Sequence, residues 1–182
     1  MRLCVSIRRF DCVTRRGATT ATMGTCASFC QESSVDLPMK KMFADSHGLP
    51  FHVLRIYDGD TLTIRWRPKS VRRQYSIIAS CRLQGIDTPE LRGSSPEEKT
   101  RAIAAKNELA RVLSLGRWLV RVENLDKYGR PLVTIVPGDQ AARNQLSPSS
   151  TSLNDHLVQA GHAVIYDGRN KKRAWANRNK HA

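Results

Sequence analysis

Apolar and polar residues take on a regular rhythm near residue 49, and this change divides the chain. The segment 51–57 is rich in β-forming residues, and 61–66 alternates apolar with polar side chains. A period of two places every second side chain on one face, as in a half-buried strand. A third such segment covers 75–86, and Asp58–Gly59 marks a turn after the first. The pattern predicts three consecutive strands joined as a meander.

A helical period follows these strands. A capping-box sequence begins at Ser95, with proline at the first helical position. Apolar residues then recur at helical spacing through 103–113, and Gly116 ends the segment. The remaining predicted elements are strands at 118–122 and 131–136 around a hairpin turn at 126–130, a helix at 153–160 and a short edge strand at 162–166.

Five strands with a helix after the third define the fold class that we expect. It is a β-rich α+β domain, a five-stranded OB-fold Greek-key barrel with two to three helices. The domain would occupy residues 49–167, and a chain of 182 residues has room for one such core plus appendages. Residues 1–48 are expected to be a disordered targeting or anchoring segment. Residues 168–182, with six basic residues and no acid, are expected to be a basic tail.

The net charge of the chain limits the kinds of binding partner that we expect. A formal net charge of +14 attracts polyanions, which are nucleic acid or an anionic membrane surface. A soluble basic protein without such a partner is the alternative. The five cysteines are an odd number and four lie in the first thirty residues, so a reducing, intracellular setting is expected. No apolar run approaches the about 20 residues of a membrane span.

The N-terminal segment supports several hypotheses. Residues 1–31 are rich in arginine, serine and threonine and hold a single acid, Asp11, as in a mitochondrial presequence. If translation starts at Met23, the sequence fits a myristoylation pattern at Gly24, with Cys26 and Cys30 as palmitoylation sites. Two acyl chains would anchor the protein stably to a membrane. A plain disordered tail is the third interpretation.

Carboxylates gather where the predicted strands end. Asp60 follows the first turn, and Asp87 leaves the end of the third strand. If the barrel closes, these two carboxylates can meet on neighbouring strands. With the carbonyl of Thr88 and water, they would form an oxygen site suited to Ca²⁺.

Two arginines and one further carboxylate would complete a hydrolytic site. Arg82 and Arg130 could each donate to a phosphate, and Glu90 could position or deprotonate a water molecule. Each residue also has a structural interpretation. These are a solvated ion pair for Arg82, a turn-shaping role for Asp58 and packing against the sheet for Tyr128.

Three segments, 57–61, 82–90 and 126–130, together resemble the staphylococcal nuclease (thermonuclease) family. They occur in the family's order, and the resemblance spans 51–166. It implies an oligonucleotide-binding barrel and Ca²⁺-dependent cleavage of DNA and RNA. By position, it implies catalytic roles for Arg82, Glu90 and Arg130, metal ligation by Asp60, Asp87 and Thr88, and substrate binding by Lys127, Tyr128 and Tyr166.

The chain departs from the family pattern in the longer segment between Asp60 and Arg82 and in an expanded loop at 141–152, and we expect the family's C-terminal helix to be shortened or lost. The predicted function is a Ca²⁺-dependent nuclease with low sequence specificity. The alternative is a non-catalytic OB-fold module that binds nucleic acid or serves as an adaptor, and a protein that acts mainly at a membrane surface is a third possibility. We expect a monomer, either mitochondrial or anchored to a membrane by acylation.

Overall fold

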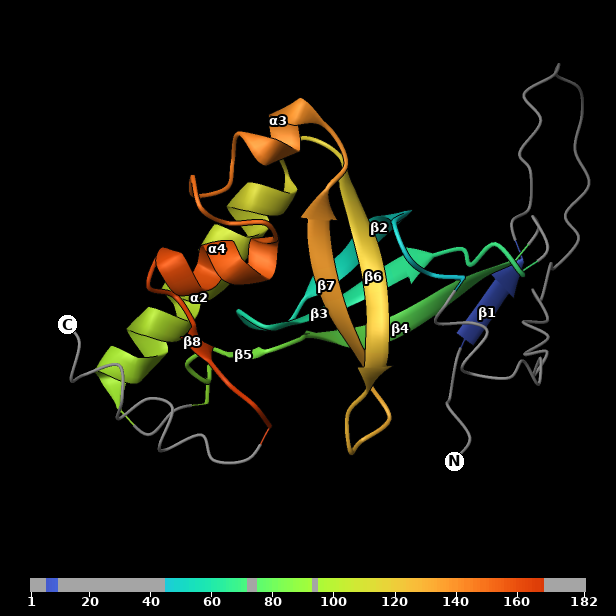
Figure 1. The fold of residues 1–182 in the computed structure, drawn as a ribbon. Helices are drawn as coiled ribbons and strands as arrows, with labels where there is room; N and C mark the ends of the chain where they lie inside the picture. Colours follow the sequence, from blue (N-terminus) through green and yellow to red (C-terminus); the bar gives the residue numbers. More distant parts are fainter. Residues whose placement is uncertain (1–5, 10–44, 72–74, 93–94, 169–182) are drawn as a thin grey trace, which may run out of the picture.

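The computed structural model describes residues 6–9, 45–71, 75–92 and 95–168 of the chain (Figure 1). The acylation hypothesis at Gly24, Cys26 and Cys30 and the basic tail beyond residue 168 concern residues outside these ranges, and of the hypothetical presequence at 1–31 only residues 6–9 are described. The monomeric state and the cellular location likewise stay predictions. Within the described ranges, no helix is both long enough and apolar enough to cross a bilayer.

Five strands close into a barrel, which confirms the predicted fold class. They hydrogen-bond in the order β4-β3-β2-β6-β7, and β7 pairs in parallel with the end of β4 to close the ring. The other four pairings are antiparallel. The strands are β2 (Leu49–Ile56), β3 (Thr61–Trp66), β4 (Tyr75–Leu83), β6 (Trp118–Leu125) and β7 (Pro131–Pro137).

The barrel interior is filled by alternate residues of its strands, as the hydrophobic pattern predicted. In β3, Leu62 and Ile64 are fully buried and Trp66 is nearly so. In β6 and β7, alternate valine and isoleucine side chains face the same core. Burial of one such side chain stabilises the fold by about 1.5–3 kcal/mol. The core therefore holds the strand ends, where the candidate site lies, in fixed register.

Three helices of the described chain lie on one side of the barrel (Figure 1). They are α2 (Pro96–Leu113), α3 (Gln140–Arg143) and α4 (Leu153–Gln159). The predicted cap of α2 is confirmed, because Ser95 Oγ accepts a hydrogen bond from the Glu98 amide at 3.1 Å. The α3 helix was not predicted. It is a single turn capped by Asp139, whose Oδ1 accepts from the Ala142 amide at 2.8 Å.

A histidine joins α4 to α2. His156 Nε2 lies 3.0 Å from Glu108 Oε1, and His156 Nδ1 accepts a hydrogen bond from the backbone amide of Ser147. Because Nδ1 is an acceptor, the proton lies on Nε2, which donates to Glu108. This contact fixes the two helices to each other and lies outside the candidate site described below.

The predicted C-terminal end of the third strand is wrong. The prediction ran through 75–86, but β4 ends at Leu83, and a turn at Gln84 and Gly85 separates it from β5 (Ile86–Asp87). The β5 strand pairs with β8 (Val164–Ile165), which confirms the predicted short edge strand. The break carries Asp87 away from the line of β4, so that it can turn back toward the side chain of Arg82.

One further strand was not predicted. The β1 strand (Ser6–Arg9) pairs antiparallel with Tyr75–Ile78 at the start of β4. Since β7 contacts only the last residues of β4, the same edge of β4 is shared between β7 at one end and β1 at the other. Nothing in the local sequence of 6–9 signals this distant partner. The domain boundaries themselves stay a prediction.

Candidate nucleic-acid site

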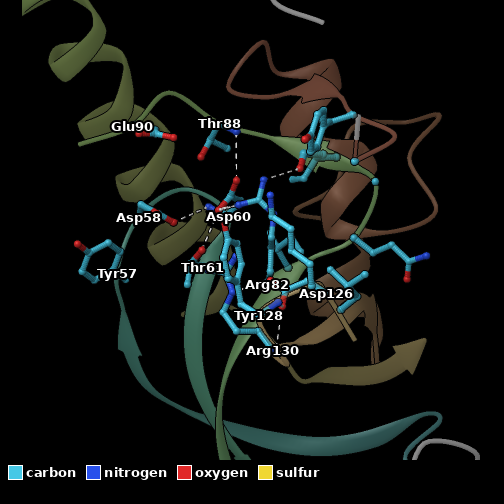
Figure 2. Close-up of a pocket in the computed structure, with 18 of the residues that line it drawn as sticks. Tyr57, Asp58, Asp60, Thr61, Arg82, Thr88, Glu90, Asp126, Tyr128 and Arg130 are labelled. Carbon is cyan, nitrogen blue, oxygen red and sulfur yellow. Dashed lines mark hydrogen bonds and ion pairs between the residues drawn. The ribbon is translucent and has the colours of Figure 1, made fainter. Parts of the chain in front are cut away.

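A cavity of about 750 Å³ opens at the end of the barrel, between the β2–β3 turn, the end of β4 and the β6–β7 hairpin (Figure 2). Eight of the nine predicted site residues line this cavity. The ninth, Asp87, is 1 % exposed and does not line it, but it accepts a hydrogen bond from Arg82, which does. The eight are Asp60, Arg82, Thr88, Glu90, Lys127, Tyr128, Arg130 and Tyr166. Residues from four separate segments thus share one cavity.

The centre of the site is an arginine held between two buried carboxylates. Arg82 Nη1 donates to Asp60 Oδ1 at 2.9 Å, and Arg82 Nη2 donates to Asp87 Oδ1 at 2.7 Å. The register of β3 and β4 produces this contact, because Arg82 is opposite Thr61 and the Leu83 amide bonds the Asp60 carbonyl at 2.8 Å. Asp60 and Asp87 therefore both bond the same guanidinium, although Asp87 lies on β5, which pairs with β8 and not with β3.

The β2–β3 turn fixes the direction of Asp60. Its amide donates to Asp58 Oδ1 at 3.2 Å, so Asp58 does shape the turn. Asp60 Oδ1 also accepts from the Thr61 hydroxyl, and Oδ2 from the Thr88 amide at 3.3 Å. Gly59 is required by close approach, since a Cβ there would lie 2.7 Å from Ala105 Cβ and 3.0 Å from Thr88 Cβ. The turn is thus packed against α2 and the Thr88 loop.

The electrostatic balance of this centre is negative. Burial raises the pKa of Asp60 to about 6, and the charges of Asp58 and Asp87 act in the same direction, against Arg82, which lowers it. Burial opposes the charge on Arg82, but Asp60 and Asp87 outweigh it and raise the pKa of the guanidinium. One cation faces several carboxylates in a region of low dielectric. Additional positive charge would therefore be stabilised here.

The oxygen donors fit a hard dication in kind. Ca²⁺ takes about six to eight oxygen ligands from carboxylates, carbonyls and water. Asp60 and Asp87 supply two carboxylates that already converge on one cationic group. In the part of the chain that the structure describes, no group of three or more His, Cys, Asp or Glu side chains could hold a metal ion. Carbonyls, water or substrate oxygens would have to complete the shell, and Thr88 as a carbonyl ligand stays a prediction.

The second arginine is held by a residue that the sequence analysis missed. In the β6–β7 turn, Arg130 Nε donates to Asp126 Oδ2 at 2.6 Å, and the Arg130 and Tyr128 amides both donate to Asp126 Oδ1 at 2.8 Å. Burial would raise the pKa of Asp126, but these hydrogen bonds outweigh it and lower the pKa. The Nη groups of Arg130 form no hydrogen bond with the described residues, so they remain able to donate to an anion in the cavity.

The side chain of Tyr128 does not pack against the sheet. It is 72 % exposed, and two cations lie near its ring, with Lys127 Nζ at 5.0 Å and Arg130 Cζ at 5.5 Å from the centroid. An exposed ring flanked by cations suits a nucleobase with its phosphate. Tyr166 also lines the cavity, half-buried, and its amide donates to the Gly85 carbonyl at 2.9 Å.

Glu90 is exposed and lines the cavity beyond the Thr88 loop. In Figure 2 it lies on the side of Asp58, at a distance from the hairpin that carries Arg130. Glu90, Asp60 and Arg82 therefore line the same cavity, although Glu90 comes from the loop beyond Thr88.

A buried asparagine supports the site from behind. Asn154 Nδ2 donates to the carbonyls of Gln84 and Val133 at 2.9 and 3.1 Å, and its Oδ1 accepts from the Ile135 amide at 3.2 Å. Asn154 is 4 % exposed and belongs to α4. It ties α4 to β7 and to the turn that separates β4 from β5, which sets where Asp87 emerges.

The fold and the cavity together define a class: a closed five-stranded OB-fold barrel whose cavity is lined by carboxylates, arginines and an exposed aromatic ring. A family model described as staphylococcal nuclease homologue matches residues 80–181. The match covers more than half of the chain, so the protein belongs to this family, as its sequence motifs indicated. No curated protein matches the chain. Family membership and fold support a nuclease or nucleic-acid-binding module.

Proposed function

We propose that the protein is a Ca²⁺-dependent nuclease that hydrolyses phosphodiester bonds of DNA or RNA with low sequence specificity. The observation that carries the proposal is the convergence in one cavity of two buried carboxylates on Arg82, with Glu90 and Arg130 facing the same space. These are the group types that a metal-assisted phosphodiesterase needs. Their supply from separate segments makes a purely structural ion pair a less complete explanation.

The carboxylates would bind the metal ion and activate the water molecule. Asp60 and Asp87 would hold Ca²⁺, with the Thr88 carbonyl, and the ion would neutralise phosphate charge and polarise the phosphorus. Glu90 positions a water molecule or takes its proton while the water oxygen bonds to phosphorus and the P–O bond to the leaving nucleotide breaks. The leaving oxygen takes up a proton from solvent.

The arginines act on the phosphate. Arg82 and Arg130 donate to its non-bridging oxygens, where charge grows in the transition state. Arg130 can do so while Asp126 holds its Nε, because its Nη groups face no protein acceptor among the described residues. Arg82 can do so without losing either carboxylate, because its bonds to Asp60, Asp87 and the Ile86 carbonyl use three of the five N–H donors of a guanidinium. Lys127, Tyr128 and Tyr166 bind the adjoining nucleotide.

A second function, a non-catalytic nucleic-acid-binding module, is favoured by one observation. Both arginines are already ion-paired, Arg82 with Asp60 and Asp87, and Arg130 with Asp126. In such a module these pairs would be permanent structural links. The exposed Tyr128 and the net charge of +14 would then account for binding without cleavage.

The metal dependence of cleavage separates the two functions. Purified protein is incubated with supercoiled plasmid and with single-stranded RNA, in parallel with Ca²⁺, with Mg²⁺ and with a chelator. The nuclease proposal predicts cleavage with Ca²⁺ that the chelator abolishes. Retarded but intact nucleic acid under every metal condition would favour the binding module. Equal cleavage with and without chelator would contradict the metal assignment.

A further inference from the structure

A second exposed tyrosine lies at the mouth of the same cavity, outside the set of residues discussed above. Tyr57 directly follows β2, lines the cavity beside Asp58 and is 45 % exposed. The guanidinium carbon of Arg55 lies 5.9 Å from the centre of its ring. Tyr57 and Arg55 thus form an aromatic–cation pair of the same kind as Tyr128 with Arg130. We call it the β2 pair.

The β2 pair and Tyr128 are on different hairpins. Tyr57 belongs to the β2–β3 hairpin, whereas Tyr128 belongs to the β6–β7 hairpin. In Figure 2 the two rings are separated, and Asp58 and the Asp60–Thr61 segment lie between them. One nucleobase therefore cannot stack on both rings. Two aromatic–cation pairs on either side of a carboxylate–arginine centre fit two different nucleotides of one strand.

The positive charge of the protein favours a nucleotide over an apolar ligand at the β2 pair. Leu54 and Val53, next to Arg55 on β2, are also partly exposed and could suit a protein partner. However, neither lines the cavity, whereas Tyr57 does, and Arg55 belongs to the subsite only through its contact with the Tyr57 ring. A ring contributes a sequence-independent stacking face, and a neighbouring arginine can contact the phosphate of the same nucleotide. The net charge of +14 also favours a polyanion.

We propose that Tyr57 and Arg55 form a second nucleotide subsite, in which the Tyr57 ring stacks on a base across the carboxylate–arginine centre from Tyr128. The inference rests on the proposed nucleic-acid substrate but not on its cleavage. A strand that fills both subsites spans the centre.

Binding of short strands tests the subsite. Fluorescence anisotropy is measured in Ca²⁺ with labelled oligothymidylates of two and of eight nucleotides, and with an eight-unit abasic strand. The full chain carries Glu90→Gln, so that the probes stay intact. In this background Tyr57→Ala, Tyr57→Phe and Arg55→Gln are compared. Leu54→Ala, a residue of similar exposure outside the cavity, is the matched control.

The expected result is selective. Tyr57→Ala weakens binding of the eight-nucleotide strand by about tenfold, the lower range for loss of one stacked base, because the ring is only half exposed. It leaves binding of the dinucleotide and of the abasic strand unchanged, and Tyr57→Phe restores the affinity. Arg55→Gln weakens the eight-nucleotide and abasic strands alike and lowers the salt dependence of both.

Three results would overturn the subsite. These are undiminished binding of the eight-nucleotide strand by Tyr57→Ala, an equal loss in Leu54→Ala, or an equal loss on the abasic strand. Failure of the proposed activity has a different signature. If the wild-type chain binds the strands but never shortens them, the nuclease proposal fails and the subsite stands. If it cleaves them while Tyr57→Ala binds normally, the subsite alone fails.

Discussion

Replacement of Arg82 by methionine removes the one cation between two buried carboxylates. The side chains of Asp60 and Asp87 are 3 % and 2 % exposed, against 14 % for Arg82, so both carboxylates would be left in a poorly solvated region. Removal of one partner from a buried pair costs about 3–5 kcal/mol. Since Arg82 keeps some contact with water, we expect a loss near the lower end, about 3 kcal/mol of unfolding free energy at pH 8 in chelator.

The loss should depend on pH in a defined direction. The pKa of Asp60 is raised to about 6 by burial even with Arg82 present, and without the guanidinium it would rise further. A carboxyl with a raised pKa in the folded state contributes stability that is present below its unfolded pKa of about 3.9 and is lost as pH rises through the folded pKa. The difference between Arg82→Met and wild type should therefore be smaller at pH 5 than at pH 8.

Urea unfolding followed by tryptophan fluorescence measures these differences, because Trp66 and Trp118 are buried in the core. The control is Arg121→Met, which removes an exposed arginine of β6 outside the cavity. Saturating Ca²⁺ should stabilise Arg82→Met more than wild type, since the ion would neutralise the uncovered carboxylates. If Arg82→Met matches wild type at pH 8 in chelator, the electrostatic description of the site is refuted.

Two further predictions concern the supports of the site. Asn154→Ala removes three hydrogen bonds of a buried side chain, and the Val133 carbonyl keeps only its bond from the Gln84 amide, so the unfolding free energy should fall by about 3 kcal/mol. The exposed Asn144→Ala should change it by less than about 0.5 kcal/mol, and an equal effect of both in urea unfolding would contradict the role of Asn154. Gly59→Ala places a Cβ 2.7 Å from Ala105 Cβ and should lower the unfolding free energy by about 1–3 kcal/mol. Adding Ala105→Gly should recover part of that loss. Strictly additive effects of the two substitutions on the unfolding free energy would show that the two residues are not in contact.

The elements that the sequence predicted well are those that local patterns specify. The alternation in 61–66 and the cap at Ser95 depend on neighbouring residues, and both appear in the structure. The break after Leu83 was missed because the apolar pattern resumes at Ile86, directly beyond Gln84 and Gly85. Only the pairing of β5 with the distant β8 reveals it. The β1 strand and the one-turn α3 helix were missed for similar reasons.

In the site, too, local motifs predicted some features, whereas others depend on contacts between distant residues. The motifs indicated which residues gather, and eight of the nine line one cavity. They could not show what each residue binds in the protein itself. Arg82 was predicted to hold a phosphate, and the structure shows its two bonds to Asp60 and Asp87. The hold of Asp126 on Arg130 could have been suspected from their spacing in the turn. The exposure of Tyr57 depends on tertiary packing and gave no signal.

The proposal of a nuclease depends most directly on Glu90, because metal ions and arginines also serve proteins that only bind. The decisive measurement is the initial rate of cleavage of single-stranded RNA at saturating Ca²⁺ by wild type, Glu90→Gln and the control Glu123→Gln, an exposed residue of β6 outside the cavity. We predict a loss of about 10²–10⁴-fold for Glu90→Gln with RNA affinity unchanged, and no loss for Glu123→Gln. Undiminished cleavage by Glu90→Gln would contradict the account.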